Sequence, residues 1–170
     1  GAGAGERDAR TGVGRHIRRA TGRDRKAVLS LVNQPEFFRP DELEIAREVF
    51  DEAIKNGAGG HYQSFVIEDR GRAAGWVCYG PTPCTLGTFD IYWIVVAAGE
   101  QGRGLGKALM RFAEKGICAR GGRLAVIETS SRATYDPTRK FYERLGYRES
   151  ARVRDFYSPG DDKIISVKKM

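Results

Sequence analysis

The sequence has 170 residues, of which 41% are hydrophobic and 30% charged, and its formal net charge is +7. These proportions are ordinary for a globular protein, and a chain of this length typically builds one hydrophobic core. No apolar run approaches the length of a membrane-spanning helix. Composition therefore excludes a helical membrane protein, and the first residues also lack the apolar stretch of a signal peptide, so we expect a cytoplasmic protein without a membrane partner.

The first residues combine Gly, Ala and charged side chains without apolar periodicity. Residues 1–13 are therefore predicted to be a mobile leader, and residues 14–170 a single domain. The domain begins with a short predicted strand, Arg15–Ala20, and much of the positive charge lies between Arg15 and Lys26. A basic stretch can attract nucleic acid, but no nucleic-acid-binding motif accompanies it, and a polyanionic ligand favours a positive surface equally well. Nucleic acid is therefore not the favoured partner.

Two helices are predicted next, each from a capping signal. Thr21 and Asp24 have the spacing of a capping box at the start of the first helix. Asp41 is predicted to cap the second helix, with Glu44 completing its capping box, and Gly57 to end it.

Strand-like runs dominate the middle of the chain. His61–Glu68 and Ala73–Tyr79 are predicted strands joined by a hairpin turn at Asp69–Arg72. A loop over Gly80–Gly87 follows. Phe89–Ala97 is the most apolar run of the sequence and predicts a central strand buried on both faces.

The remaining elements complete one crossover and one hairpin. A helix over Gly104–Arg120 and a buried strand over Leu124–Thr129 form, with the preceding strand, a βαβ unit. Asp136 as N-cap and Gly146 as terminator bracket a short helix. Two final strands flank the turn at Ser158–Asp161, so the elements predict a mixed α/β (α+β) sheet of six or seven strands with helices on its faces.

The loop Gln101–Lys107, which reads Gln-Gly-Arg-Gly-Leu-Gly-Lys, carries the strongest chemical signal. It joins a predicted strand to a predicted helix. Glycines let the backbone approach a ligand closely, and the helix adds the positive end of its dipole, so the loop is typical of an anion site. Taken alone, the same glycines are compatible with a tight strand-to-helix turn.

Two motifs together extend this interpretation. The run from Val96 to Gly106 reads Val-x-Ala-x-x-Gln-x-x-Gly-x-Gly and resembles the acyl-CoA signature of the GNAT N-acyltransferase superfamily, with Ala98 where proline is common. Later, Phe141–Tyr147 reads Phe-Tyr-x-x-x-Gly-Tyr, similar to the end of a helix in that family. The motifs stand in the family's order, and the resemblance covers nearly the whole chain.

The resemblance implies a mostly antiparallel mixed sheet with helices on both faces, in which two central parallel strands splay apart after Val95 and Val96. Acetyl-CoA would bind in that gap and donate its acetyl group directly to a primary amine in a ternary complex, the acceptor being a small amine, an amino-acid-like molecule or a peptide. The cofactor-binding residues implied are Ile94, Val95, Val96, Gln101, Gly102, Arg103, Gly104, Leu105, Gly106, Lys107 and Tyr135, the last standing where the family usually has asparagine.

Three residues are candidates for the proton chemistry. Asp90 matches the position of the catalytic glutamate of histone-type members, and Glu128 lies near that of ribosomal-protein-acetylating members. Either carboxylate is also compatible with a plain ion pair near a strand end, and the sequence does not choose between them. Tyr142 matches the tyrosine that protonates the departing thiolate, and a phenol holds its proton at neutral pH. The alternative for Tyr142 is a packing role.

Candidate walls of the acceptor site are Phe37, Phe38, Arg39, Tyr92 and Tyr157, although aromatic residues more often pack a core. A CoA-binding regulatory module without turnover and a basic nucleic-acid-binding domain are the competing interpretations. The sequence also allows a homodimer.

Cysteine and histidine are too few to suggest other chemistry. The three cysteines show no CxxC spacing and suit a reducing cytosol, so no disulfide framework or zinc site is expected. The two histidines, His16 and His61, do not suggest a histidine-built metal site. No cysteine has a nearby histidine to activate it as a covalent nucleophile.

Overall fold

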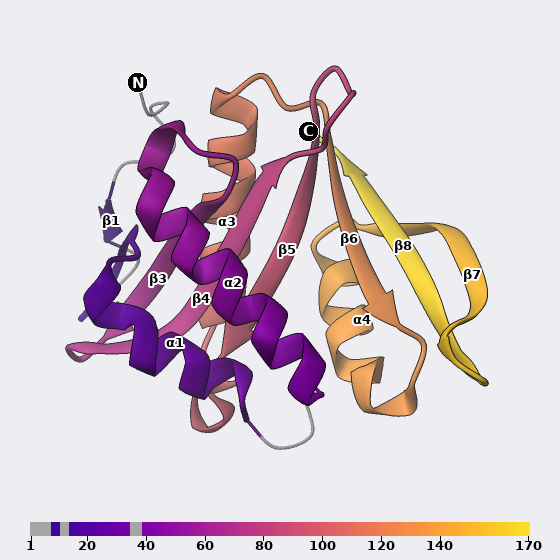
Figure 1. Cartoon of the computed structure of the whole chain (residues 1–170), viewed down its shortest axis with the longest axis horizontal. Coiled ribbons are helices and arrows are strands. Elements are labelled where there is room, and N and C mark those ends of the chain that lie inside the picture. The colour runs from indigo at the N-terminus through magenta and orange to yellow at the C-terminus, as the bar shows by residue number, and fades with distance from the viewer. Residues whose placement is uncertain (1–7, 11–13, 35–38) are drawn as a thin grey trace.

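The structure is a computed structural model that describes residues 8–10, 14–34 and 39–170. Its strands form one sheet with the order β1-β2-β3-β4-β5-β6-β8-β7 (Figure 1). The strand bounds are β1 Ala9–Arg10, β2 Arg15–Arg19, β3 Gln63–Asp69, β4 Arg72–Pro81, β5 Thr88–Val96, β6 Leu124–Ser130, β7 Arg148–Ser158 and β8 Asp161–Lys169. Neighbouring strands are antiparallel except β5 and β6, so the predicted mixed, mostly antiparallel sheet is confirmed.

The sheet has eight strands rather than six or seven. The additional strand is the two-residue β1, in which Ala9 pairs with Ile17 and Arg10 with His16. These residues belong to the segment predicted to be a leader. The rest of that segment, residues 1–7 and 11–13, lies outside the described residues.

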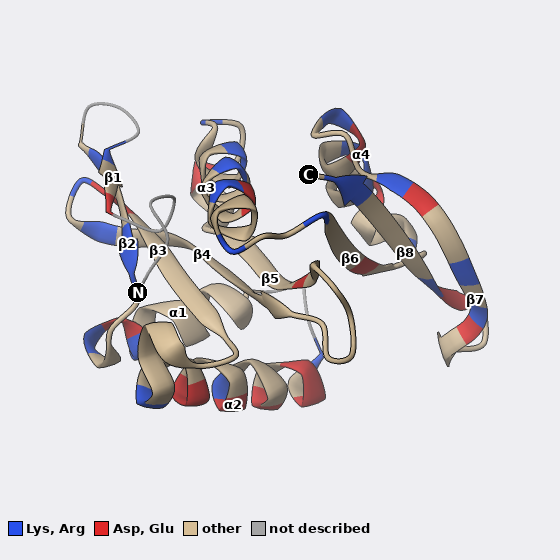
Figure 2. Ribbon diagram, turned by 90° about the horizontal axis from the view of Figure 1, so that it is seen from above, with Lys and Arg blue, Asp and Glu red and all other residues tan. Residues whose placement is uncertain are grey.

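Helices cover both faces of the sheet, as predicted (Figure 2). Their bounds are α1 Arg25–Val32, α2 Pro40–Asn56, α3 Leu105–Ala119 and α4 Asp136–Arg144. The first two lie on one face, over a core that includes Phe50 and Trp76. α3 and α4 lie on the other face, over a larger core that includes Leu109 and Phe112. In the described part of the chain, no helix is long and apolar enough to cross a membrane.

The capping predictions fared differently at different helices. The Thr21 amide donates to Asp24 Oδ2 at 2.8 Å, as the capping box predicts, and a short 3₁₀ turn precedes α1. For α2 the prediction was wrong: Arg39 is the N-cap, because Pro40 with its preset φ takes the first helical position. Asp41 is therefore inside the first turn.

Two further details of these helix starts differ from the predictions. Glu44, expected to complete a capping box, instead forms an ion pair with Arg47. At α4, Tyr135 is the N-cap and Asp136 is inside the helix, where it pairs with Arg139. An acidic side chain in the first turn still stabilises the helix, because it faces the positive end of the dipole.

The gap between β5 and β6 opens earlier than predicted. The two strands pair from Thr88 to Asp90 on β5 and from Leu124 to Val126 on β6, and then diverge (Figure 1). The expected point of divergence was after Val95 and Val96. A β-bulge explains the difference: Cys78 on β4 pairs with Trp93, and Tyr79 pairs with Ile91, so Tyr92 is an extra residue. Bulges bend a strand and increase its twist.

β5 is also less buried than its composition predicts. Phe89 and Ile91 are buried, but Asp90 is half-buried and Tyr92 is 36% exposed. The prediction of a strand buried on both faces was therefore wrong. Phe89, Ile91 and Val95 belong to the core, whereas the half-buried Trp93, Ile94 and Val96 border the cavity.

Candidate active site

A cavity of about 1110 Å³ lies where β5 and β6 diverge. Its lining comes from α2, β5, α3, β6, α4, β7 and the loops between them. Most residues proposed from the sequence line it, namely Arg39, Asp90, Tyr92, Ile94, Val95, Val96, Gln101, Gly102, Gly104, Leu105, Gly106, Lys107, Glu128, Tyr135, Tyr142 and Tyr157. Phe37 and Phe38 lie outside the described residues.

The glycine-rich loop presents backbone N–H groups to this cavity. Gly104 is the N-cap of α3 with φ of +81°, a value that favours glycine. The Ala108 amide donates to the Gly104 carbonyl at 3.0 Å. This is the first hydrogen bond of the helix. The amides of Leu105, Gly106 and Lys107, which precede Ala108, therefore have no acceptor within the helix. These three residues line the cavity at the positive end of the helix dipole.

Lys107 adds a positive charge to the same place. Among the described residues it has no carboxylate partner within ion-pair distance. A cation in the first turn of a helix opposes the dipole, so its position suits an anionic ligand better than the unliganded helix.

Gly106 fixes how closely α3 approaches α4. A Cβ built there would lie 3.2 Å from Cζ of Phe141 and 3.5 Å from Cγ2 of Val96. The missing side chain thus brings the Phe141-Tyr142 motif close to the start of α3.

Arg103 does not line the cavity. Its Nη1 donates to Asp69 Oδ2 at 2.7 Å and also bonds to Glu100. Asp69 is a buried carboxylate at the end of β3, and Arg15 approaches it as well, at 3.9 Å. Arg103 thus ties the loop to the β3–β4 hairpin, and its contact with a phosphate stays a prediction.

Asp90 stands at the point where the strands part, and it lines the cavity. Oδ2 accepts a hydrogen bond from Thr82 Oγ1 at 2.7 Å, and the Tyr92 hydroxyl lies 3.5 Å from the same oxygen. Oδ1 accepts no hydrogen bond from the described residues. One oxygen is therefore held in place while the other is available to a ligand.

Glu128 lies across the gap on β6 and is more exposed. Its side chain is 47% exposed, and Oε2 is 3.0 Å from Lys163 Nζ. The ion pair expected as the alternative role of Glu128 is therefore present, and it occupies one of the two carboxylate oxygens.

Tyr142 on α4 lines the cavity and is almost fully buried. The residue is 6% exposed, and its ring packs against Phe141 and Tyr147. Burial, with a smaller contribution from Tyr135, raises the pKa of the Tyr142 phenol well above its usual value. Its hydroxyl makes no hydrogen bond to any residue that the structure describes. The group is a protonated donor without an acceptor.

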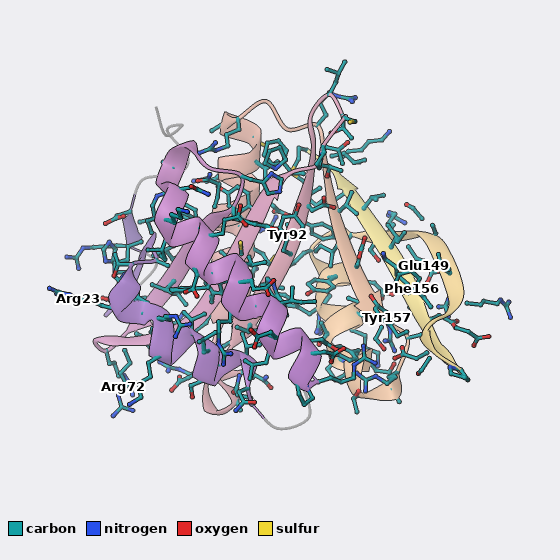
Figure 3. The ribbon with its side chains drawn as sticks, in the orientation of Figure 1. Arg23, Arg72, Tyr92, Glu149, Phe156 and Tyr157 are labelled. Atoms are coloured by element: carbon teal, nitrogen blue, oxygen red, sulfur yellow. The ribbon has the colours of Figure 1, made fainter. Side chains whose placement is uncertain are left out.

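The acceptor side of the cavity is aromatic and charged. Tyr92 from β5 and Tyr157 from β7 lie on opposite sides of the gap (Figure 3). The Arg39 guanidinium lies 6.0 Å from the centre of the Tyr157 ring, and its Nε is 3.3 Å from a carboxylate oxygen of Glu42. Tyr135 is buried beside Arg132.

The sequence interpretation missed Gln34, which lines the cavity, and His61, which lies outside the lining and contacts it through Tyr92. The Gln34 amide, just after α1, accepts from the Ala98 N–H at 2.5 Å and donates to the Val96 carbonyl at 3.3 Å. His61 Nε2 lies 2.9 Å from the Tyr92 hydroxyl. A lone Gln after a helix and a lone His before a strand carry no local signal, so only the fold reveals them.

Comparison with known proteins gives a consistent result. Residues 60–149 match the model of the acetyltransferase (GNAT) domain. A protein from Desulfovibrio desulfuricans described as an acetyltransferase of the GNAT family is 41% identical, with a TM-score of 0.86 over 91% of this chain and 98% of that chain. No curated protein matches the chain in sequence.

Two more distant structures are similar in fold. The ribosomal-protein-S18-alanine N-acetyltransferase from Escherichia coli is 23% identical, with a TM-score of 0.72 over 91% of this chain and 93% of that one. An aminoglycoside 6'-N-acetyltransferase complexed with coenzyme A is 16% identical, with a TM-score of 0.71 over 90% and 96% of the two chains.

Proposed function

Because the chain belongs to the GNAT family of acetyltransferases, we propose that it transfers the acetyl group of acetyl-CoA to a primary amine by direct attack in a ternary complex. The acceptor is a small amine or an amino-acid-like molecule. One observation carries this proposal: a single cavity joins the amides at the start of α3 to Asp90 and Tyr142 through the gap between β5 and β6.

The residues around the gap fit acetyl-CoA. The free amides of Leu105, Gly106 and Lys107, with the Lys107 ammonium, suit a pyrophosphate. On β5, the backbone groups that face β6 have no strand partner beyond Asp90, which leaves them for the amides of a pantetheine arm. When bound, the cofactor supplies the acetyl group as an activated thioester.

Asp90 is the proposed base. An amine must be unprotonated to attack a carbonyl carbon. Asp90 lines the cavity, and its Oδ1, which accepts no hydrogen bond from the described residues, is the atom that takes the proton. Thr82 holds the other oxygen and so fixes the carboxylate plane. Glu128 is the second candidate, on the opposite strand, with Lys163 on one of its oxygens.

Tyr142 is the proposed acid. Breaking the thioester leaves a negative charge on sulfur, which a nearby proton donor neutralises. Burial keeps the Tyr142 phenol protonated, and its hydroxyl has no acceptor among the described residues. It is therefore ready to donate to the leaving group.

The test is a turnover screen with the whole chain. Acetyl-CoA is offered with amino acids, polyamines, aminoglycosides and basic peptides, and released thiol and acetylated product are both measured. We expect equal amounts of the two with at least one amine and no acetylated protein on the way. The proposal would be contradicted if none of the four classes of amine were acetylated. It would also be contradicted if an acetylated enzyme formed and broke down fast enough to be an intermediate.

A further inference from the structure

Tyr92 links the cavity to a histidine outside it. As the extra residue of the β5 bulge, it lies between two titratable side chains. Its hydroxyl is 3.5 Å from Asp90 Oδ2 and 2.9 Å from His61 Nε2. The three groups form a continuous line from the proposed base to a half-buried side chain outside the cavity lining.

The position of His61 is built into the fold rather than left to a loose loop. A Cβ at Gly80 on β4 would lie 2.5 Å from the His61 carbonyl oxygen and 3.1 Å from Nε2. Gly80 has no left-handed φ, so its small size, and not its flexibility, is what the site uses. The imidazole also packs edge-on against Tyr62, with ring centres 4.8 Å apart, and Tyr62 packs against Tyr92 at 5.2 Å. Together these contacts fix the direction of Nε2.

The surroundings favour proton movement along this line. No carboxylate among the described residues lies within ion-pair distance of His61. Tyr62 and Tyr92 are the titratable groups that face it, and behind Tyr62 lie Glu52 from α2 and the buried Cys78 from β4. Burial, with Asp90 as the next cause, raises the pKa of Tyr92 well above its usual value. The phenol between Asp90 and His61 thus stays neutral.

We propose that His61, acting through Tyr92, removes the proton that Asp90 takes from the acceptor amine and passes it to solvent. This inference rests on the proposed function. In the step, the Asp90 carboxyl group, protonated on Oδ1, makes a half turn that brings its O–H to the side of Tyr92. That O–H bond breaks as the proton binds the Tyr92 oxygen, and the Tyr92 proton moves to His61 Nε2. Asp90 returns to a carboxylate, Tyr92 remains a phenol, and His61 becomes an imidazolium. It then loses a proton to water, and exchange with water restores the tautomer with Nε2 free.

The direction of transfer follows from ordinary acidities. A carboxylic acid is a stronger acid than an imidazolium, so transfer of the proton from a carboxyl group to an imidazole is favourable. The route is useful because acceptor and cofactor fill the cavity during the reaction and cut Asp90 off from bulk water. His61 and Tyr92 are positioning residues, since neither needs to touch the reacting atoms.

The experiment compares the pH dependence of kcat, at saturating substrates, for the unmodified chain, His61→Gln, Tyr92→Phe and the double variant. His16→Gln is the matched control, because His16 lies on β2 outside the cavity lining. We expect kcat of the unmodified chain and of the control to fall on the acidic side of neutrality, because a protonated imidazole cannot accept the proton from Tyr92. Either His61→Gln or Tyr92→Phe should abolish that fall and lower the plateau by about 10-fold, and the double variant should be no worse.

A second measurement does not depend on turnover. The titration midpoint of His61, followed by NMR in the folded protein, should move in Tyr92→Phe, while that of His16 should not. The relay is overturned if His61→Gln keeps the acidic fall in kcat, or if Tyr92→Phe leaves the His61 midpoint unchanged. If the chain transfers no acetyl group to any amine, the proposed function is contradicted. The NMR titration would then still show whether His61 and Tyr92 are coupled.

Discussion

The hydroxyl and the ring of Tyr142 serve separate purposes, so a single substitution separates them. Tyr142→Phe keeps the ring between Phe141 and Tyr147 and deletes the proton donor. We expect kcat to fall by about 10²- to 10⁴-fold, because the loss belongs to the transition state. Acetyl-CoA affinity by calorimetry and the melting temperature should hardly change. Full activity would contradict the general-acid role, and a selective loss of affinity would identify a cofactor contact instead.

The two carboxylates are distinguished by pH. Asp90→Asn removes the proposed base but leaves a similar shape, so it should lower turnover about 10²-fold or more near pH 7. At alkaline pH the acceptor amine is already unprotonated, and the loss should shrink. Glu128→Gln, which removes the carboxylate paired with Lys163, should change the rate little at either pH. If the two variants behave the opposite way, Glu128 is the base.

At the scale of one element, the start of α3 depends on a backbone angle more than on space. A Cβ added at Gly104 would have space, because the nearest atom of another residue, Arg15 Nη1, would lie 3.9 Å away. The backbone angle φ of Gly104, however, is +81°. Valine is strained at such an angle, so Gly104→Val should turn the loop amides away from the cavity. Acetyl-CoA at about 100 times its Kd should stabilise the unmodified chain by about 2.7 kcal/mol, seen as a rise in melting temperature.

That rise should disappear in Gly104→Val while the fold persists by circular dichroism. Gly99→Val is the matched control, because Gly99 has open space and no left-handed φ, and it lies outside the cavity lining. If acetyl-CoA raises the melting temperature of Gly104→Val as much as that of the unmodified chain, the anion site does not lie at the start of α3.

The loop that precedes α3 is held from outside the cavity. If Arg103 acts by anchoring the loop to Asp69, then Arg103→Ala and Asp69→Asn should each weaken acetyl-CoA binding by about 5-fold, roughly 1 kcal/mol. The double variant should be little weaker than either, because each single substitution already removes the bond between Arg103 and Asp69. Calorimetry measures the affinities, and Arg72→Ala, exposed on the same hairpin, is the control. Direct phosphate binding by Arg103 predicts instead that Asp69→Asn binds as tightly as the unmodified chain.

Across the whole molecule, the features that the sequence predicts are those encoded locally. The glycines at the start of α3 and the apolar strand–helix–strand pattern are features of neighbouring residues. The crossover and the loop that lines the cavity could therefore be predicted from them. Prediction failed where a contact joins distant segments. Arg103 meets Asp69 across 34 positions, and His61 meets Tyr92 across 31. Neither pairing has a periodic signature, because each depends on how the strands align.

The gap itself illustrates the same limit. An apolar run such as β5 predicts a buried strand, but the place where it leaves β6 is set by the bulge at Tyr92, which depends on its register with β4. The same bulge puts the Tyr92 hydroxyl between Asp90 and His61. One register shift thus determines both the opening of the cavity and the side chains along its wall.

The two sides of the gap are also joined by a buried polar cluster, and its strength can be measured. Glu114 on α3 accepts hydrogen bonds from the Tyr147 hydroxyl at 2.8 Å and the Lys168 ammonium at 2.9 Å, so it connects α3 to the β8 side of the sheet. Glu114→Ala leaves the buried Tyr147 hydroxyl without this partner, which should lower the free energy of unfolding by about 1–3 kcal/mol. Lys168, partly exposed, can turn to water and limits the loss.

Urea denaturation measures this change, with Glu143→Ala on the exposed face of α4 as the control. Because Glu114 lies outside the cavity lining, acetyl-CoA affinity should survive once the variant is folded. Stability equal to that of Glu143→Ala would show that the cluster contributes nothing to holding the two sides together. A variant that keeps its stability but loses affinity would mean that Glu114 acts on the cavity through α3 instead.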